Sequence, residues 1–171
     1  MGVTQAAGLS LKWFRDNFCG AEKDTAALMD VDEYYLMDKE AETVPIGAER
    51  LLYLPYLMGE RTPHLDPDAR GVFFGMSMDS TRADMTQAVL EGVAFALRDS
   101  FEVAKSLGIR IERTKICGGG AKSPLWKKMI ANILNLKVDV IESEEGPALG
   151  GAMLAAVACG EFESVEAAAA K

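Results

Sequence analysis

Apolar side chains recur at the spacing of an amphipathic helix in several stretches of the chain. Residues that commonly end helices follow three of these stretches, at Gly20, at Pro45 and Gly47, and at Gly108. The pattern predicts helices over residues 3–18, 22–43, 81–107, 124–134 and 148–158. The last of these is rich in alanine and glycine and follows a turn at 142–146, and we expect it to pack closely on a sheet.

Short apolar or alternating runs between the helices are typical of β-strands. Residues 51–57 form a short apolar run, which predicts a buried strand, and residues 110–116 alternate isoleucine with charged side chains. Further strands are predicted at 72–76 and 137–141. Because strands alternate with helices along the chain, the sequence predicts an α/β fold.

Three consecutive glycines, Gly118 to Gly120, stand between a predicted strand and a predicted helix. Without a Cβ atom, the backbone there can adopt a positive φ and let a ligand approach closely. Ser123 is a good N-cap and Pro124 a favourable first helical residue. The N–H groups and the positive dipole end of the helix would then face the loop, which favours a phosphate group there.

Two common phosphate-binding motifs do not fit this loop. The dinucleotide-binding fingerprint requires G-x-G-x-x-G, and Ala121 and Ser123 interrupt that spacing. A P-loop requires glycine directly before its lysine, whereas Ala121 precedes Lys122. The spacing alone therefore leaves open a tight turn whose glycines only permit packing of helix against strand.

The complete run from Gly118 to Trp126, followed by Ala131-Asn132-Ile133-Leu134, resembles the adenosine-loop motif of the FGGY carbohydrate kinases. Three further motifs, at residues 53–64, 90–99 and 148–156, resemble the same family in the same order. Within the family, residues 53–64 are most similar to the xylulose kinases. The resemblance extends over nearly the whole chain, but it concerns only the C-terminal domain of these enzymes.

This resemblance implies a ribonuclease-H-like, actin-like ATPase fold, with residues 1–171 as a C-terminal nucleotide-binding domain. In the family, early strands of this domain precede the first helix found here. We therefore expect a fragment that lacks those strands and also lacks the N-terminal sugar-binding and catalytic lobe. The implied reaction transfers the γ-phosphate of ATP to a sugar hydroxyl, with D-xylulose as the expected substrate and D-xylulose 5-phosphate as the product.

The resemblance also assigns ligands and residues. ATP or ADP, Mg²⁺ and a pentulose are the expected ligands, and the full-length enzyme is expected to be a homo-oligomer. The catalytic base, most sugar contacts and most metal ligands of the family lie in the N-terminal lobe, so we expect no catalytic and no metal-binding residue in this chain. The residues assigned to the nucleotide are Gly118, Gly119, Gly120, Ala121 and Ser123.

Two positions in the first predicted helix extend this nucleotide site. In glycerol kinases of the same superfamily, a glycine and a glutamine one helical turn later touch the nucleotide, and Gly8 and Lys12 are the matching positions. Lysine departs from the family pattern, so Lys12 is either a nucleotide contact or a solvated helix residue. A glycine inside a helix costs about 1 kcal/mol relative to alanine. Close packing against a neighbour or the approach of a ligand would explain why Gly8 is nevertheless there.

Other candidate residues have structural interpretations. Trp126 shares a helical stripe with Ile130 and Ile133, which predicts a core residue and not a platform for adenine. His64 and Asp66, in the polar loop 59–71, could form an acid–base pair, but a lone histidine in a loop is more often structural. The acidic stretch 22–43 is expected to be a solvated face.

The amino-acid composition argues against several classes of protein. Hydrophobic residues make up 49% and charged residues 26% of the chain, as in globular proteins, and the net charge of −8 does not suit a nucleic-acid partner. No apolar run approaches the roughly 20 residues of a membrane span, and no signal peptide is recognisable. Three distant cysteines suit small buried residues in a reducing cytoplasm.

The polar loop 59–71 bears on the choice between two functions. One is the nucleotide-binding part of a sugar kinase, in which this loop faces the cleft between the lobes. The alternative is a non-catalytic nucleotide-binding or interaction module that retains the actin-like fold. A module without a cleft has no need of such a loop, so the sequence favours the kinase.

Overall fold

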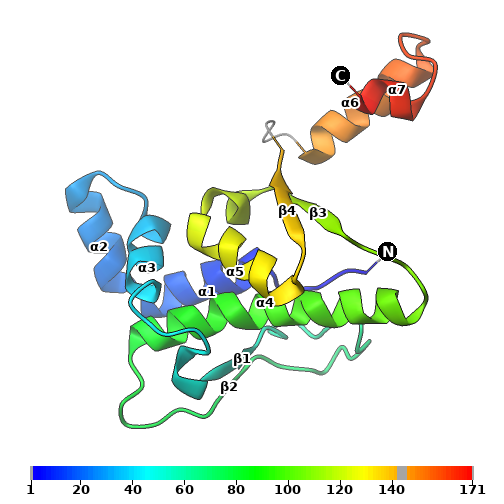
Figure 1. Ribbon diagram of the computed structural model, residues 1–171. Coiled ribbons are helices and arrows are strands. Elements are labelled where there is room, and N and C mark those ends of the chain that lie inside the picture. Colours follow the sequence, from blue (N-terminus) through cyan, green and yellow to red (C-terminus); the bar gives the residue numbers. More distant parts are fainter. Residues whose placement is uncertain (1, 142–145, 171) are drawn as a thin grey trace.

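The computed structural model describes residues 2–141 and 146–170 (Figure 1). Its strands are β1 (Leu52–Leu54), β2 (Val72–Phe74), β3 (Arg113–Ile116) and β4 (Lys137–Val140). Two short 3₁₀ turns are η1 (Ala48–Arg50) and η2 (Gly119–Lys122). The α-helices are α1 (Gly8–Phe18), α2 (Gly20–Met29), α3 (Glu33–Ala41), α4 (Arg82–Ser106), α5 (Pro124–Leu134), α6 (Gly146–Ala158) and α7 (Val165–Ala169).

The long helix α4 is the element on which the others pack, and α1, α3, α5 and β1 all contact it. Its start is fixed by a capping box, in which Thr81 accepts from the backbone N–H of Asp84 and donates its own N–H to the Asp84 carboxylate. Gly108, with φ of +82°, follows its end. The prediction of a helix over 81–107 is confirmed, and Val89 and Val93 are buried as expected.

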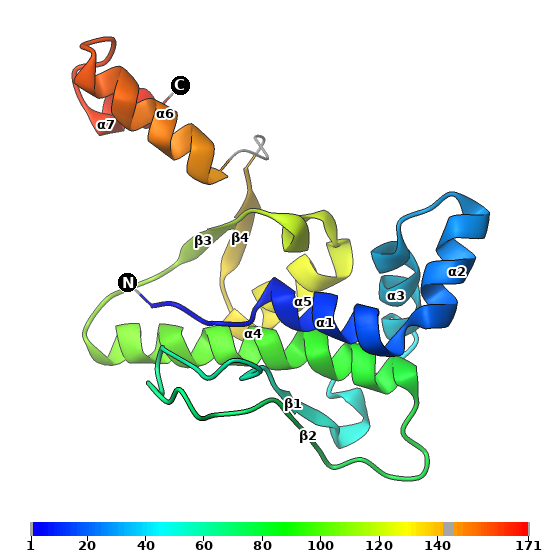
Figure 2. The same cartoon turned by 180° about the vertical axis from the view of Figure 1, so that it is seen from behind.

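Strands β1 and β2 form an antiparallel hairpin under α4, on the side away from α1 and α5 (Figure 2). Tyr53 faces α4 and is 3% exposed, whereas Leu52 and Leu54 are 52% and 42% exposed. The predicted strand at 51–57 is thus shorter than expected and buried on one face only, because a two-stranded hairpin covers α4 with a single face. A Cβ on Gly92 would lie 2.2 Å from the Tyr53 carbonyl oxygen, so only glycine permits this contact.

Strands β3 and β4 form a separate parallel pair, in which Arg113 lies opposite Lys137 and Ile116 opposite Val140. The glycine loop and α5 connect these two strands. The predicted order of strand, glycine loop and helix is confirmed. Short connections of this kind place the loop at the end of a strand and at the start of a helix, where ligand sites of α/β proteins commonly lie.

The first helix begins later than its apolar pattern suggested. Residues 3–5 are held by the loop after β1, because Val3 and Thr62 exchange hydrogen bonds and the Gln5 N–H donates to Glu60 Oε1 at 3.2 Å. Gly8 is therefore the first residue of α1 and does not lie inside it. The cost of an internal glycine does not arise, and Gly20 begins α2.

The predicted helix at 22–43 is two helices. Asp30 adopts a left-handed conformation with φ of +53° and ends α2, and the Asp32 carboxylate accepts from the Tyr34 N–H at 2.7 Å as the N-cap of α3. Short polar side chains favour such ends and caps, which is why the helical pattern breaks here. Met37 and Ala41 are buried, and so are the acidic residues Glu22 and Asp38, for which the expectation of a solvated face is wrong.

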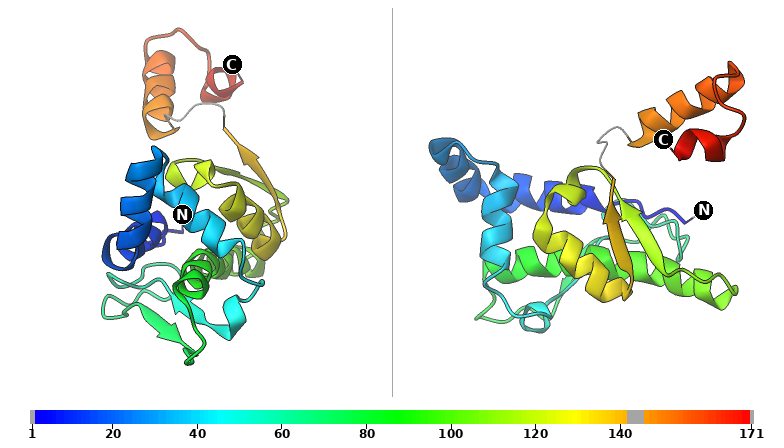
Figure 3. Two further views of the ribbon diagram at one scale, coloured as in Figure 1. Left: turned by 90° about the vertical axis from the view of Figure 1, so that its left-hand side faces the viewer. Right: turned by 45° about the horizontal axis from the view of Figure 1, so that its top comes forward.

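The last two helices, α6 and α7, pack on each other and project from the rest of the chain (Figure 3). None of the described side chains of α6 is buried, and Leu154 is 59% exposed, so the expectation that this helix packs closely on a sheet is wrong. The predicted turn at 142–146 falls almost entirely outside the described residues. Within the described ranges, no helix is long and apolar enough to cross a membrane.

The cysteines differ from one another in their surroundings. Cys19 is fully buried, and burial raises the pKa of its thiol to about 11. Cys117 and Cys159 are exposed, so the interpretation of all three as small buried residues holds only for Cys19. All three are free thiols.

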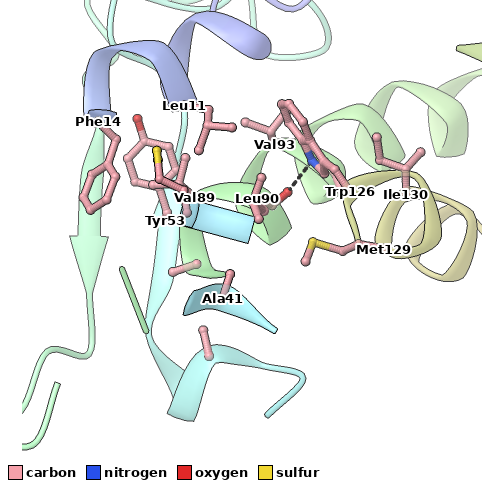
Figure 4. Packing of buried hydrophobic residues seen from close by; sticks show 14 of the residues in the cluster. Leu11, Phe14, Ala41, Tyr53, Val89, Leu90, Val93, Trp126, Met129 and Ile130 are labelled. Carbon is pink, nitrogen blue, oxygen red and sulfur yellow. Dashed lines mark hydrogen bonds between the residues drawn. The ribbon is translucent and has the colours of Figure 1, made fainter. Parts of the chain in front are cut away.

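The apolar stripe of α5 is buried against α4 as predicted (Figure 4). Trp126 is 5% exposed, and its indole Nε1–H donates to the Leu90 carbonyl oxygen at 3.0 Å. A carbonyl has two lone pairs, so Leu90 can accept this bond in addition to the bond within α4. The interpretation of Trp126 as a core residue is confirmed.

Trp126→Ala should lower the free energy of unfolding by about 3–5 kcal/mol, because it removes a buried ring and a hydrogen bond at once. Trp13→Ala is the control, since Trp13 is only partly buried at the edge of the core. Urea unfolding followed by circular dichroism measures both. Equal losses of stability in the two variants would contradict the central role of Trp126.

Candidate functional site

The glycine loop leaves the end of β3 through Cys117 and enters α5 at Ser123. Gly118 has φ of +79°, which favours glycine, and the chain then forms the turn η2, in which the Ala121 N–H donates to the Gly118 carbonyl at 3.0 Å. Ser123 caps α5 by accepting from the Trp126 N–H at 2.9 Å, and Pro124 is the first residue of the helix. The predicted cap and the predicted proline position are both confirmed.

The three glycines of the loop have different surroundings. A Cβ on Gly120 would lie 3.1 Å from the Trp126 ring, so this glycine allows the loop to rest on the indole. A Cβ on Gly118 or Gly119 would meet no atom within 4 Å. The open face of the loop is therefore at Gly118 and Gly119, and a ligand that approaches the backbone would do so there.

Gly8 and Lys12 lie at the start of α1, which packs on the same side of α4 as α5 does (Figure 2). A Cβ on Gly8 would also meet no atom within 4 Å. The Lys12 ammonium forms an ion pair with Asp16 at 2.9 Å, as expected of a solvated helix residue. Hydrogen bonds from Lys12 and from Arg15 lower the pKa of Asp16 to about 2.

Asp38, on α3, is a residue of this site that the sequence did not single out. It is 8% exposed, and this burial raises the pKa of its carboxyl group. A hydrogen bond with Ser123 lowers the pKa, but by less than burial raises it. The Ser123 hydroxyl thus accepts from the α5 backbone and interacts with Asp38. In the sequence, Asp38 is one of many acidic residues in a charged stretch, and nothing in the spacing distinguishes it.

The polar loop 59–71 does not form the acid–base pair considered from the sequence. Asp66 Oδ1 accepts from the N–H groups of Asp68 and Ala69 at 2.8 and 3.1 Å, and so shapes the turn. His64 Nε2 lies 3.1 Å from the Tyr56 hydroxyl and 3.9 Å from Asp99 Oδ2. Asp66 bonds to the backbone of its own loop and His64 bonds to Tyr56, so the two residues do not pair with each other.

The arrangement of the glycine loop and the start of α5 suits the binding of a ligand. The open glycine backbone can let a phosphate-bearing ligand approach, and the positive dipole end of α5 favours its negative charge. In the described part of the chain, no group of three or more His, Cys, Asp or Glu residues is placed to hold a metal ion.

Asp38→Asn should become more stable relative to the parent as the pH rises. The pKa of Asp38 is higher in the folded state than the reference 3.8. The protonated carboxyl group of Asp38 therefore favours the folded state. This stabilisation is fully present at pH values below the reference pKa and is lost as the pH rises through the folded-state pKa. Asparagine keeps a carbonyl acceptor for Ser123 but does not titrate.

Urea unfolding at several values between about pH 3 and pH 7 tests this difference. Asp24→Asn, at an exposed position of α2, controls for the loss of one negative charge. A stability difference between parent and Asp38→Asn that does not change with pH would contradict the placement of Asp38.

Comparison with known proteins shows the family to which this chain is related. The model of the FGGY family of carbohydrate kinases, C-terminal domain, matches residues 1–159. The chain is 44% identical to the xylulose kinase of Bacillus subtilis (strain 168) over 166 residues, which are 97% of this chain and 31% of that protein. It is 36% identical to the gluconokinase of the same strain over 167 residues, covering 97% of this chain and 33% of that protein.

Solved structures also match the fold of this chain. The ligand-bound xylulose kinase from Lactobacillus acidophilus superimposes with a TM-score of 0.79 at 28% identity, over 95% of this chain and 31% of that chain. The chain therefore spans about a third of the length of these relatives. The resemblance drawn from the sequence motifs is confirmed. By its family match, its relatives and its actin-like ATPase fold, this chain belongs to the FGGY family of carbohydrate kinases and corresponds to their C-terminal domain.

Proposed function

We propose that this chain is the nucleotide-binding part of a two-lobed, ATP-dependent sugar kinase that phosphorylates D-xylulose. The observation that carries the proposal is the open backbone at Gly118 and Gly119, directly before the capped start of α5. Ala121 and Ser123 complete the loop, and Gly120 seats it on Trp126. We assign Gly8 and Lys12, on α1, to the same nucleotide site.

Each feature of the loop suits a nucleotide. A glycine backbone without side chains admits a flat base or a sugar to within contact distance. The positive dipole end of α5 favours the negative charge of phosphate groups near this loop. Mg²⁺-bound ATP would supply the phosphoryl group, and the residues of this chain would hold and orient its nucleoside side.

The sugar is assigned by relatives and not by contacts in this chain. The B. subtilis xylulose kinase is 44% identical to the chain and the B. subtilis gluconokinase 36%, which favours a pentulose over gluconate. The sugar pocket, the catalytic base and the ligands of Mg²⁺ would belong chiefly to the other lobe. We further propose that the complete enzyme is a cytoplasmic homo-oligomer.

Gly119→Val tests the nucleotide site. A Cβ at this position meets no protein atom within 4 Å, so the valine side chain should fill the open space, keep the fold and weaken binding of Mg-ATP at least about tenfold. Gly120→Val is less informative, because its side chain would strike Trp126. Isothermal titration on the complete enzyme measures the affinity.

Gly151→Val is the matched control, since a Cβ there also meets no atom within 4 Å and α6 lies apart from the loop. This control should bind Mg-ATP like the parent. If Gly119→Val also binds like the parent, the assignment of the loop to the nucleotide is wrong.

The chain of 171 residues alone should show no sugar kinase activity. Phosphoryl transfer requires the acceptor hydroxyl to be held in line with the γ-phosphate, and such positioning can supply about 7–11 kcal/mol of the barrier. With one side of the cleft absent, neither the positioning nor the closure that excludes water can occur.

A coupled assay of ADP release with D-xylulose and Mg-ATP measures this activity. The complete enzyme is the positive control and should prefer D-xylulose to D-gluconate. Sugar-dependent turnover that follows the purified chain would show that the active site lies within it. His64, Asp66 and Asp68 would then be the first residues to mutate.

A further inference from the structure

A cavity of about 580 Å³ lies between residues 41–47, helix α4 and helix α5. Its volume is in the range of small-molecule binding sites. Neither Gly8, Lys12 nor the glycine loop at 118–123 lines it. The cavity therefore shares no assigned residue with the candidate nucleotide site, although Pro124 and Leu125 at the start of α5 border it.

The walls of this cavity are mainly apolar. Large apolar side chains come from all three surrounding segments: Val44, Ile46, Phe95, Leu125, Met129 and Ile133. At its edge, Ile46 is 91% and Phe95 46% exposed. Apolar side chains that border a cavity and remain exposed gain free energy when a ligand removes them from water.

An unpartnered acceptor lies in the lining. Gln87 is 3% exposed, and its Nε2 donates to Glu91 Oε1 at 2.9 Å. A carboxylate can only accept, so this bond fixes which way the amide is turned and directs Oε1 away from Glu91. Gln87 Oε1 is buried without a hydrogen-bond partner and has almost no accessible surface, which costs free energy. A small turn of the amide towards the cavity would let a donor on a bound molecule recover it.

The charges around the cavity indicate what kind of molecule fits. Glu42 and Glu91 line it together with one cation, Lys128. Glu91 also accepts from the Gly47 N–H at 2.9 Å, so its charge is held in place by the protein. A net negative lining disfavours phosphorylated and carboxylated ligands, and with them ATP and sugar phosphates.

From the apolar walls, the buried acceptor and the net negative lining, we propose that this cavity is a binding site for a small neutral aromatic molecule that carries one hydrogen-bond donor. The ring would lie against the apolar walls, and the donor would bond to Gln87 Oε1. The proposal does not depend on the nucleotide assignment, because the two sites share none of the assigned residues.

A pair of probes tests this on the unaltered protein. Indole has an aromatic body and one N–H donor, and 1-methylindole has a similar body without the donor. Titrations followed by NMR should show saturable binding of indole, and binding of 1-methylindole at least about tenfold weaker. Absence of indole binding, or equal affinities, would overturn the proposal. Displacement of indole by ATP would also overturn it, because the cavity would then be part of the nucleotide site.

Two variants locate the binding. Gln87→Leu removes the acceptor and should abolish the preference for indole over 1-methylindole, whereas Ser100→Ala, which alters a polar residue of α4 outside the cavity, should preserve it. Ile133→Trp keeps the acceptor but fills the cavity from α5, and should abolish binding of both probes. Circular dichroism checks that each variant is folded. Unchanged indole binding in a folded Ile133→Trp protein would place the probe elsewhere and refute the site.

Discussion

The contact between Trp126 and α4 determines where the glycine loop lies. The indole is buried against the long helix and donates to the Leu90 carbonyl, so α5 is fixed both by apolar area and by a directional bond. Gly120 then rests on the same ring. The loop is thus supported from below by the core, while Gly118 and Gly119 face open space. A binding loop needs this combination, because an unsupported glycine run would lose its shape and a covered one would admit no ligand.

A second contact ties the loop to the helical pair α2 and α3. Asp38 reaches the Ser123 hydroxyl, which also caps α5. The site is therefore assembled from segments far apart in the chain, and each segment has its own anchor on α4 or on a neighbour of α4. The N-terminal segment is held in a similar way, through Glu60 and Thr62 of the loop after β1.

The function proposed above, as one part of a two-lobed kinase, would account for what this chain contains. It carries an open backbone, a capped helix start and a firm core beneath them, all of which would serve binding in that function. His64 and Asp66 are engaged in local contacts and not in a shared acid–base pair. The chemistry of phosphoryl transfer depends mainly on positioning and charge neutralisation, and the groups that provide these for the acceptor sugar belong to the other lobe in the function proposed above.

The sequence by itself determined the elements with strong local patterns. The extents of α4 and α5, the cap at Ser123, the proline at 124 and the core role of Trp126 all follow from periodicity and helix-end chemistry, which act within a few residues. The family could also be recognised, because its motifs are contiguous. Only the tertiary structure decided where α1 begins, since residues 3–5 bond to a loop almost sixty residues away. It also decided that Asp38 is buried and that α6 has no sheet beneath it among the described residues, because burial depends on which distant segments meet.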